Sequence, residues 1–398
     1  MNDKIFKLKG VVQHYAWGGF SFIPNLLKLK PTNQQPYAEY WLGAHTSAPS
    51  VVVNKNISLL ELINQNPEKI VGQEVVKQYN GLPYLFKILD VHEMLSIQVH
   101  PNKEEAIKGF EKEEQAGIPI NAINRNYKDK NHKPEVMIAL SEFWLLHGFK
   151  EKSEIEQTLT NHLELNLLLP TFKKEGIKGL YKIAMELPQE QVNTILKPIV
   201  KKSIFNKSQN LINKHNTEWW IAKFYANNST ENLDRGIFSI LLFNIVQLQK
   251  GEAIFQAAGI PHAYLEGQNV ELMANSDNVL RGGLTPKHID VPELLKHTLF
   301  QSIQPSTIKP QINGNEKTYL CPVPDFSISI ISLKVGERYS SHTFSFEILL
   351  VIEGAIIIQG LENNIIKQGE AIGIVADTNY TFTATGDAII FKAFVPQP

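Results

Sequence analysis

Short apolar runs separated by turn residues dominate the chain up to about residue 149. Runs of this length, rich in β-branched and aromatic residues, predict β-strands. The clearest are Tyr84–Asp90, Met94–His100, Glu135–Leu140 and Glu142–Phe149. A polar segment, residues 102–134, separates the second run from the third, and we expect it to form a surface excursion with a short helix.

The pattern changes at residue 150, and up to about residue 234 apolar residues recur at helical spacing. Strand patterns return after Glu252, with a helix expected at Val291–Leu299. A linker containing Pro and Gly then leads to strands from about Tyr319 to the end. The order of these patterns predicts a mainly β protein with an α-helical insert.

Composition narrows the class of partner. The chain of 398 residues has 39 Lys+Arg against 40 Asp+Glu, so it carries almost no net charge. Nucleic acid and anionic membranes, by contrast, require a basic surface. The run Gly236–Leu248 is shorter than the about 18 apolar residues that a membrane span needs. One cysteine and an N-terminus without an apolar signal segment point to a cytoplasmic protein. We therefore expect a small-molecule partner, no nucleic acid and no membrane.

The run Met94–His100 carries polar residues on one face only. Alternate residues of a strand share a face, so Ser96, Gln98 and His100 point one way and the aliphatic residues between them point the other. A solvated face of a half-buried sheet would show the same pattern. Taken alone, the stretch favours that simpler interpretation.

Two further segments favour a metal site. Glu135 starts the next predicted strand. His262 follows Gly251 and Gly259 at the spacing of the second motif of cupin barrels, with Ala257 in place of the motif's proline.

These residues complete a set of four possible metal ligands. The set is Gln98, His100, Glu135 and His262. Two imidazoles, a carboxylate and an amide oxygen suit one Zn²⁺ ion per chain. With one anionic ligand the site keeps a net positive charge, so the metal remains a Lewis acid.

The final segment repeats the first cupin motif without its metal-binding residues. Glu347 is present, but Phe344 stands in place of a histidine, and Tyr380 replaces the histidine of the second motif. We therefore predict two cupin-type (jelly-roll) β-barrels plus a helical domain. The expected division is a catalytic barrel (1–149 and 235–304) interrupted by a helical insert (150–234), a linker (305–318) and a C-terminal barrel without metal ligands (319–398).

Four long stretches of the chain resemble type I phosphomannose isomerases. They are YAEYWLGAHTSAPS, LSIQVHPNK, KDKNHKPEVMIAL and GIPHAYLEGQNVELMANSDNVLRGGLTPKHIDV. The resemblance implies a zinc-dependent aldose–ketose isomerase that interconverts mannose 6-phosphate and fructose 6-phosphate through an enediol. It implies that the same four ligands hold the zinc and that Arg281 acts in the site, with Lys133, Glu271 and Lys287 nearby.

The residue that moves the proton is left open. Glu271 is one candidate, since a desolvated carboxylate can have its pKa raised toward working pH; a structural pairing with Arg281 or Lys287 is equally compatible with its position. Lys133 and Asp277 are competitors for the role of base. Arg281 stays protonated and is assigned to stabilising the enediolate or orienting the sugar.

No Gly-rich phosphate cradle is present, so we expect lysine and hydroxyl groups to bind the phosphate. Lys87, Ser96 and Lys287 are the candidates, and Asp277 is included among the substrate-binding residues. The turn at Trp17 could line the mouth of the pocket. The alternative function is a non-catalytic or oxygenase-type cupin that binds a phosphorylated sugar or another small anion. A monomer or weak homo-oligomer is expected.

Overall fold

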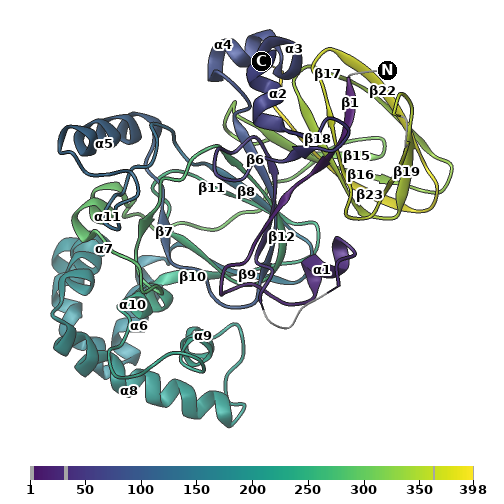
Figure 1. Ribbon diagram of the computed structural model, residues 1–398. Helices are drawn as coiled ribbons and strands as arrows, with labels where there is room; N and C mark the ends of the chain where they lie inside the picture. Colours follow the sequence, from purple (N-terminus) through teal and green to yellow (C-terminus); the bar gives the residue numbers. More distant parts are fainter. Residues whose placement is uncertain (1–3, 31–34, 362–363, 398) are drawn as a thin grey trace.

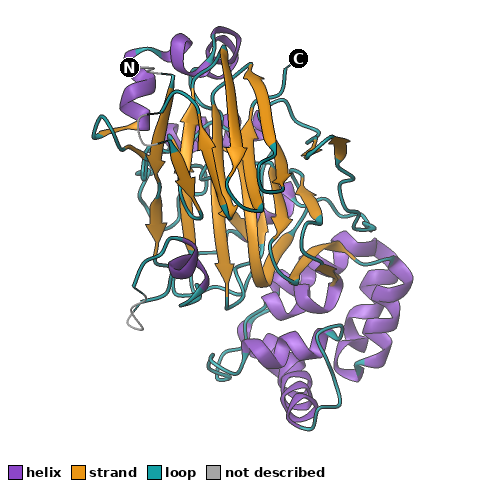
Figure 2. Ribbon diagram, turned by 90° about the vertical axis from the view of Figure 1, so that its right-hand side faces the viewer, coloured by secondary structure: helices purple, strands orange, loops and turns teal. Residues whose placement is uncertain are grey.

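The computed structural model describes residues 4–30, 35–361 and 364–397. Within these ranges the strands form sheets of ten, nine and four strands, and every pairing between named strands is antiparallel. A group of helices lies at one end of the molecule and the C-terminal strands lie at the other, with the ten-stranded sheet between them (Figures 1 and 2). In the described part of the chain, no helix is long and apolar enough to cross a membrane.

The ten-stranded sheet contains the strands predicted in the first part of the chain and those that follow the helical segment. Its strands are β2 (Val11–Gln13), β3 (Glu39–Gly43), β6 (Tyr84–Val91), β7 (Gln98–Val99), β8 (Glu135–Ala139), β9 (Phe143–Phe149), β10 (Phe243–Leu248), β11 (Ala253–Gln256), β12 (His262–Ala274) and β13 (Leu280–Arg281). The long strand β12 pairs with β6, β7, β8 and β9. It therefore brings distant parts of the sequence to one sheet.

Helices fill the segment that was predicted to be helical, residues 150–234, and one more helix follows it in the part that was expected to belong to the barrel. They are α6 (Lys152–Asn161), the 3₁₀ helix η1 (Leu163–Leu168), α7 (Leu169–Glu186), α8 (Gln189–Ser208), α9 (Thr217–Phe224) and α10 (Gly236–Leu242). Their apolar faces share a core with Ile97 and Val99 of the β7 region, and the buried Trp220 belongs to it. Burial of these faces, rather than intrinsic propensity, supplies most of the stability of such helices.

The C-terminal segment supplies most strands of the other two sheets. The nine-stranded sheet has β1 (Ile5–Lys9), β4 (Val51–Val52), β5 (Ile57–Ser58), β14 (Gln311–Asn313), β15 (Glu316–Tyr319), β16 (Ser327–Leu333), β18 (Glu347–Glu353), β21 (Ala371–Ile374) and β23 (Ala388–Phe394). The four-stranded sheet has β17 (Arg338–Thr343), β19 (Ala355–Ile358), β20 (Ile365–Lys367) and β22 (Thr378–Ala384). Strand β1 pairs with β21, so the first strand of the chain lies among strands of the last segment.

Some elements differ from the sequence expectations. The expected strand Met94–His100 is reduced to β7, because residues on either side of it bond to loops instead of a strand: Ile97 N–H donates to Gly283 O (3.1 Å), and His100 O accepts from Gly259 N–H (2.9 Å). Three short helices that the sequence did not predict cover residues 59–79. The helices outside the insert are α1 (Phe22–Leu26), α2 (Leu59–Gln65), α3 (Pro67–Val71), α4 (Gln73–Tyr79), α5 (Lys103–Gln115) and α11 (Val291–His297).

The last two of these helices confirm predictions. Helix α5 is the helix expected in the polar excursion, and its N-cap Asn102 accepts a bond from Glu105 N–H. Helix α11 begins at the expected residue, with Asp290 as its N-cap and Pro292 in its first turn.

Candidate metal centre and active-site cavity

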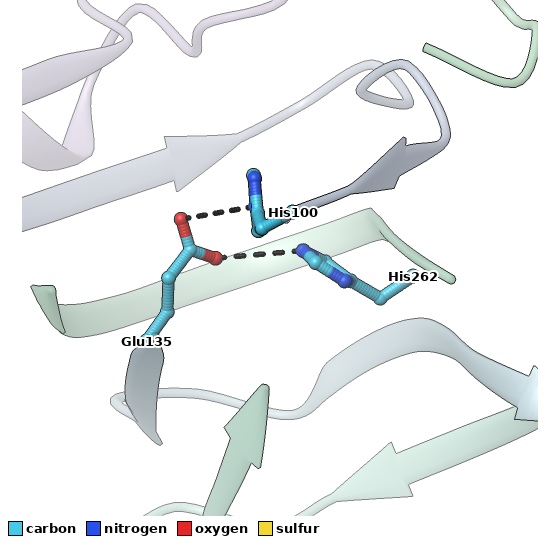
Figure 3. A group of neighbouring side chains, drawn as sticks. All are labelled: His100, Glu135 and His262. Atoms are coloured by element: carbon cyan, nitrogen blue, oxygen red, sulfur yellow. Dashed lines mark ion pairs between the residues drawn. The ribbon is translucent and has the colours of Figure 1, made fainter. Parts of the chain in front are cut away.

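Two imidazoles and a carboxylate meet inside the ten-stranded sheet (Figure 3). His100 follows β7, Glu135 begins β8 and His262 begins β12, and one possible ligand atom from each lies within 4.8 Å of the others. The carboxylate lies between the two rings, with Oε1 3.5 Å from His100 Nε2 and Oε2 3.4 Å from His262 Nε2. All three residues are buried.

Both imidazoles are oriented by main-chain carbonyls. His100 Nδ1 donates to Asn278 O (2.8 Å), and His262 Nδ1 donates to Ile260 O (2.9 Å). The proton of each neutral ring is then on Nδ1, and Nε2 presents a lone pair to the carboxylate. The buried His100 Nε2 has no hydrogen-bond partner among the described residues.

This arrangement fits a divalent metal ion. Burial, with the charge of Lys133, holds the pKa of His100 well below its usual range, so the ring is neutral as a ligand must be. Burial opposes ionisation of Glu135, but Lys133 and His100 lower its pKa well below the usual range. Lys133 Nζ lies 2.6 Å from Glu135 Oε1.

Gln98 lies beside this cluster in the sheet. It pairs with His262 across β7 and β12, and with Arg281 across β7 and β13. Directly paired residues of an antiparallel sheet point to the same face, so these three side chains form a row. Gln98 is therefore placed to supply a fourth ligand, and Arg281 lies one strand further from the cluster.

An inner cavity of about 70 Å³ adjoins the cluster. Besides the metal-site residues it is lined by a chain of buried charges. Lys87 Nζ lies 3.1 Å from Glu271 Oε1 and 3.5 Å from Glu39 Oε2, and Tyr264 Oη donates to Glu271 Oε2 (2.8 Å). Lys133 lines the same cavity.

The charges in this chain adjust one another. Burial alone would lower the pKa of Lys87, but the carboxylates of Glu39 and Glu271 hold it above its usual value. Burial raises the pKa of Glu271, against the lowering effect of the Lys87 charge. Lys87 is thus a buried, charged lysine whose charge is balanced by two carboxylates. Glu271 is a carboxylate that accepts protons more readily than usual.

An outer cavity of about 510 Å³ opens above the inner one, and Gln98 and Glu39 line both. Ser96, Arg281 and Lys287 lie in its wall. Neither of the two cations forms an ion pair with a residue that the structure describes. Burial and the neighbouring Arg281 charge lower the pKa of Lys287. The cavity therefore presents two uncompensated positive groups.

The outer cavity also takes residues from outside the sheet. Trp17 lines it, as the sequence suggested for the turn that contains it. Phe224, Asn227 and Asn228 come from the end of α9 and the loop after it. The helical segment thus forms part of the cavity wall.

Asp277 lies apart from the other candidates. Its carboxylate is 3.4 Å from His45 Nε2, its side chain is 51% exposed, and the residues lining the two cavities do not include it. The sequence reasoning overlooked Glu39 and Tyr264. A carboxylate within the apolar run AEYWLG was the available signal for Glu39; no signal marked Tyr264.

Comparison with known proteins gives consistent results. A sequence model of the family "Phosphomannose isomerase type I, catalytic domain" matches residues 5–152. The mannose-6-phosphate isomerase of Salmonella typhimurium is 38% identical over 386 residues, covering 93% of this chain and 95% of that protein. The human mannose-6-phosphate isomerase is 31% identical over 433 residues, covering 98% of each.

Solved structures extend the likeness to the whole fold. The crystal structure of the Salmonella typhimurium enzyme bound to substrate (F6P) and zinc matches with a TM-score of 0.86 and 35% identity, covering 99% of this chain and 100% of that one. The zinc-bound holo mannose 6-phosphate isomerase matches with the same score and coverage. On this identity and coverage, the chain belongs to the type I phosphomannose isomerase family.

Proposed function

We propose that this chain is a zinc-dependent isomerase that interconverts mannose 6-phosphate and fructose 6-phosphate through an enediol. The observation that carries the proposal is the buried cluster of His100, Glu135 and His262 next to a cavity with two uncompensated cations. The first part suits a metal that polarises substrate oxygens, and the second suits a phosphate group.

The zinc ligands would be His100, Glu135 and His262, with Gln98 as the fourth. Zinc, when bound, supplies a Lewis acid that polarises the carbonyl and hydroxyl oxygens of the sugar. The unpartnered Nε2 of His100 and the carbonyl bonds to both Nδ1 atoms support this assignment. Lys133, now bonded to Glu135, would have to share that carboxylate with the metal.

Proton transfer between C1 and C2 is assigned to the inner cavity. Glu271 is our candidate base, because its pKa is raised and Tyr264 and Lys87 fix both of its oxygens. Lys133 is the second candidate there. Asp277 is less suitable, since its carboxylate faces His45 outside both cavities.

Phosphate recognition is assigned to the outer cavity. Lys287 and Arg281 supply charge, and Ser96 supplies a hydroxyl donor. Arg281 lies in the row with Gln98 and His262, so it could reach both the phosphorylated end and the developing enediolate. Lys87 is assigned to holding Glu271 and Glu39, because two carboxylates already neutralise it.

We also propose the finer architecture expected from the sequence motifs. The two sheet regions would be cupin-type jelly rolls, the catalytic one formed by residues 1–149 and 235–304 and the C-terminal one by residues 319–398. The helical segment 150–234 would be an insert, and the protein would act in the cytoplasm.

A coupled assay for fructose 6-phosphate formation from mannose 6-phosphate tests the function. Activity should disappear after removal of metal with a chelator and return when zinc is added. Metal content is measured on the same samples. A stripped protein that keeps full turnover, or a zinc-loaded one without any, would rule out the proposal.

A further inference from the structure

Asn278 lies at the centre of a hydrogen-bond network behind the metal centre. It belongs to the loop between β12 and β13 and is 1% exposed. Its Oδ1 accepts from the N–H groups of Lys128 (2.7 Å) and Asp129 (3.2 Å). Its Nδ2 donates to the carbonyls of Asp129 (2.8 Å) and Asn131 (2.8 Å). Both ends of the amide are therefore bonded to one loop, residues 128–131.

The carboxylate of Asp129 closes the network from the other side. Its Oδ1 accepts from Ser276 Oγ (2.8 Å) and from Asn131 N–H (2.8 Å), and its Oδ2 accepts from Asp277 N–H (2.8 Å). The loops 128–131 and 276–278 are thus joined by side chain to backbone bonds in both directions. Asn278 and Ser276 are buried within this network, and Asp129 is half-buried. A hydrogen-bond network of this kind holds its members in one arrangement.

Each loop reaches a proposed zinc ligand, one along the chain and the other through a hydrogen bond. Residues 128–131 lead into β8, which begins with Glu135. The main-chain carbonyl of Asn278 accepts the Nδ1 proton of His100 (2.8 Å). Asn278 therefore connects two ligands that come from different parts of the sequence.

We propose that Asn278 is a positioning residue for the metal centre. Its side chain fixes the loop that precedes Glu135, and that anchoring also fixes its own carbonyl, which sets the tautomer and ring orientation of His100. The inference rests on the proposed zinc site and adds a residue that contacts neither metal nor substrate. Groups of this kind, which orient a metal ligand, typically affect metal affinity by about 10–100-fold.

The test is the zinc affinity of the metal-free protein, measured by competition with a chromophoric chelator in the absence of substrate. Asn278→Asp keeps the shape of the side chain but removes both donors and places a negative charge against two carbonyls. We expect zinc to bind about 10–100-fold more weakly. At saturating zinc, kcat should largely recover and KM should stay near the wild-type value, which a general loss of folding would not produce.

Asn244→Asp is the matched control. The Asn244 amide also donates to main-chain carbonyls, those of His147 (3.1 Å), Phe149 (3.1 Å) and Ile303 (2.8 Å), but it lies at the start of β10. The same substitution there should lower the melting temperature and leave zinc affinity within about twofold of wild type.

Asn278→Ala covers the case in which the aspartate variant does not fold, because it removes the bonds without adding charge. Folded Asn278 variants that bind zinc as tightly as wild type would rule out the positioning role of Asn278 without contradicting the zinc site. A wild-type chain that does not bind zinc would overturn the zinc site itself.

Discussion

Two buried tyrosine–carboxylate pairs lie in two different sheet regions of the molecule. Tyr264 donates to Glu271 (2.8 Å) next to the metal centre, and Tyr380 donates to Glu347 (2.7 Å) in the C-terminal segment. Burial raises the pKa of both carboxyl groups, that of Glu347 to about 7. The two pairs differ in their surroundings, since only Glu271 lies beside proposed zinc ligands.

Replacing Glu271 by glutamine should therefore lower kcat by about 10²–10⁴-fold while zinc binding is retained. A base acts in its deprotonated form, so wild-type activity should fall as pH drops through the pKa of Glu271. Because that pKa is raised, the fall should begin above the usual pKa of a glutamate, about 4.3. Steady-state kinetics across pH check this result.

Glu347→Gln is the control for this prediction. It alters a carboxylate with the same tyrosine partner outside the site, and kcat should stay near wild type. If Glu271→Gln turns over normally and Lys133→Met does not, the assignment of the base passes to Lys133.

Replacing Lys287 by glutamine removes one of the two uncompensated cations. A hydrogen bond to a charged group contributes about 1.5–3 kcal/mol, so KM for mannose 6-phosphate should rise about 10–100-fold with zinc content unchanged. Inhibition by inorganic phosphate should weaken in parallel. Lys309→Gln, at an exposed position between α11 and β14, should leave KM unchanged; an unchanged KM for the Lys287 variant would place the phosphate elsewhere.

The sequence predicted individual site residues best where their spacing carried the information. Alternation along one strand and the motif before His262 were enough to group Gln98, His100 and His262. The partners of Lys87 could not be predicted, because Glu39 and Glu271 come from other strands and their contact depends on sheet register. Asn278 was missed because its partners lie in a loop about 150 residues away in the sequence.

At the scale of elements, a close contact of two glycines joins the helical segment to the cavity. A Cβ on Gly283 would lie 2.4 Å from Gly236 Cα, at the start of α10, and Gly283 has φ +127°. Asp234 Oδ1 also accepts from the N–H groups of Gly236 (2.7 Å) and Leu284 (2.9 Å). The position of α10 and that of the loop after Arg281 are therefore set together.

Gly283→Ala should displace both α10 and the loop after Arg281. The added methyl group meets backbone atoms that cannot move independently, and the positive φ adds strain, so we expect a loss of about 2–4 kcal/mol in unfolding free energy. KM should rise as well, because Arg281 shifts with the loop. Urea unfolding and kinetics measure the two effects. Gly386→Ala, with no neighbour within 4 Å, is the control, and equal stability of both variants would contradict the prediction.

Most element types were predictable from periodicity, and most pairings were not. The helices of residues 152–224 and strands such as β6 and β9 match the apolar patterns that predicted them. Helices α2–α4 were not predicted, because they are short and lie in a region where strand patterns dominate. The small extent of β7 reflects bonds to loops, which no local pattern records.

At the scale of the molecule, the ten-stranded sheet and the C-terminal segment share a core. One cluster of buried apolar residues includes Phe86 and Val136 from the ten-stranded sheet and Phe346 and Phe391 from the C-terminal segment. Tyr84 Oη, fully buried, makes bonds of 3.0 Å to the carbonyls of Phe346 and Ala393. A shared core of this kind couples the unfolding of its parts.

We therefore predict one cooperative thermal transition for the two sheet regions. Tyr84→Phe leaves two buried carbonyls short of a donor, so it should cost about 1–3 kcal/mol and lower the transition temperature without dividing it. Calorimetry with near-UV circular dichroism tests this. Separate transitions for the two regions in the wild type would contradict it.

The pairing of β1 with β21 also has a consequence for how the protein is made. Ile5 lies opposite Ile374, so β1 finds that neighbour only after residues 6–374 have also been synthesised. At about 5–20 residues per second, this takes roughly 20–70 s. During this time the edge of β1 that will pair with β21 stays open, although β4 can already pair with the opposite edge.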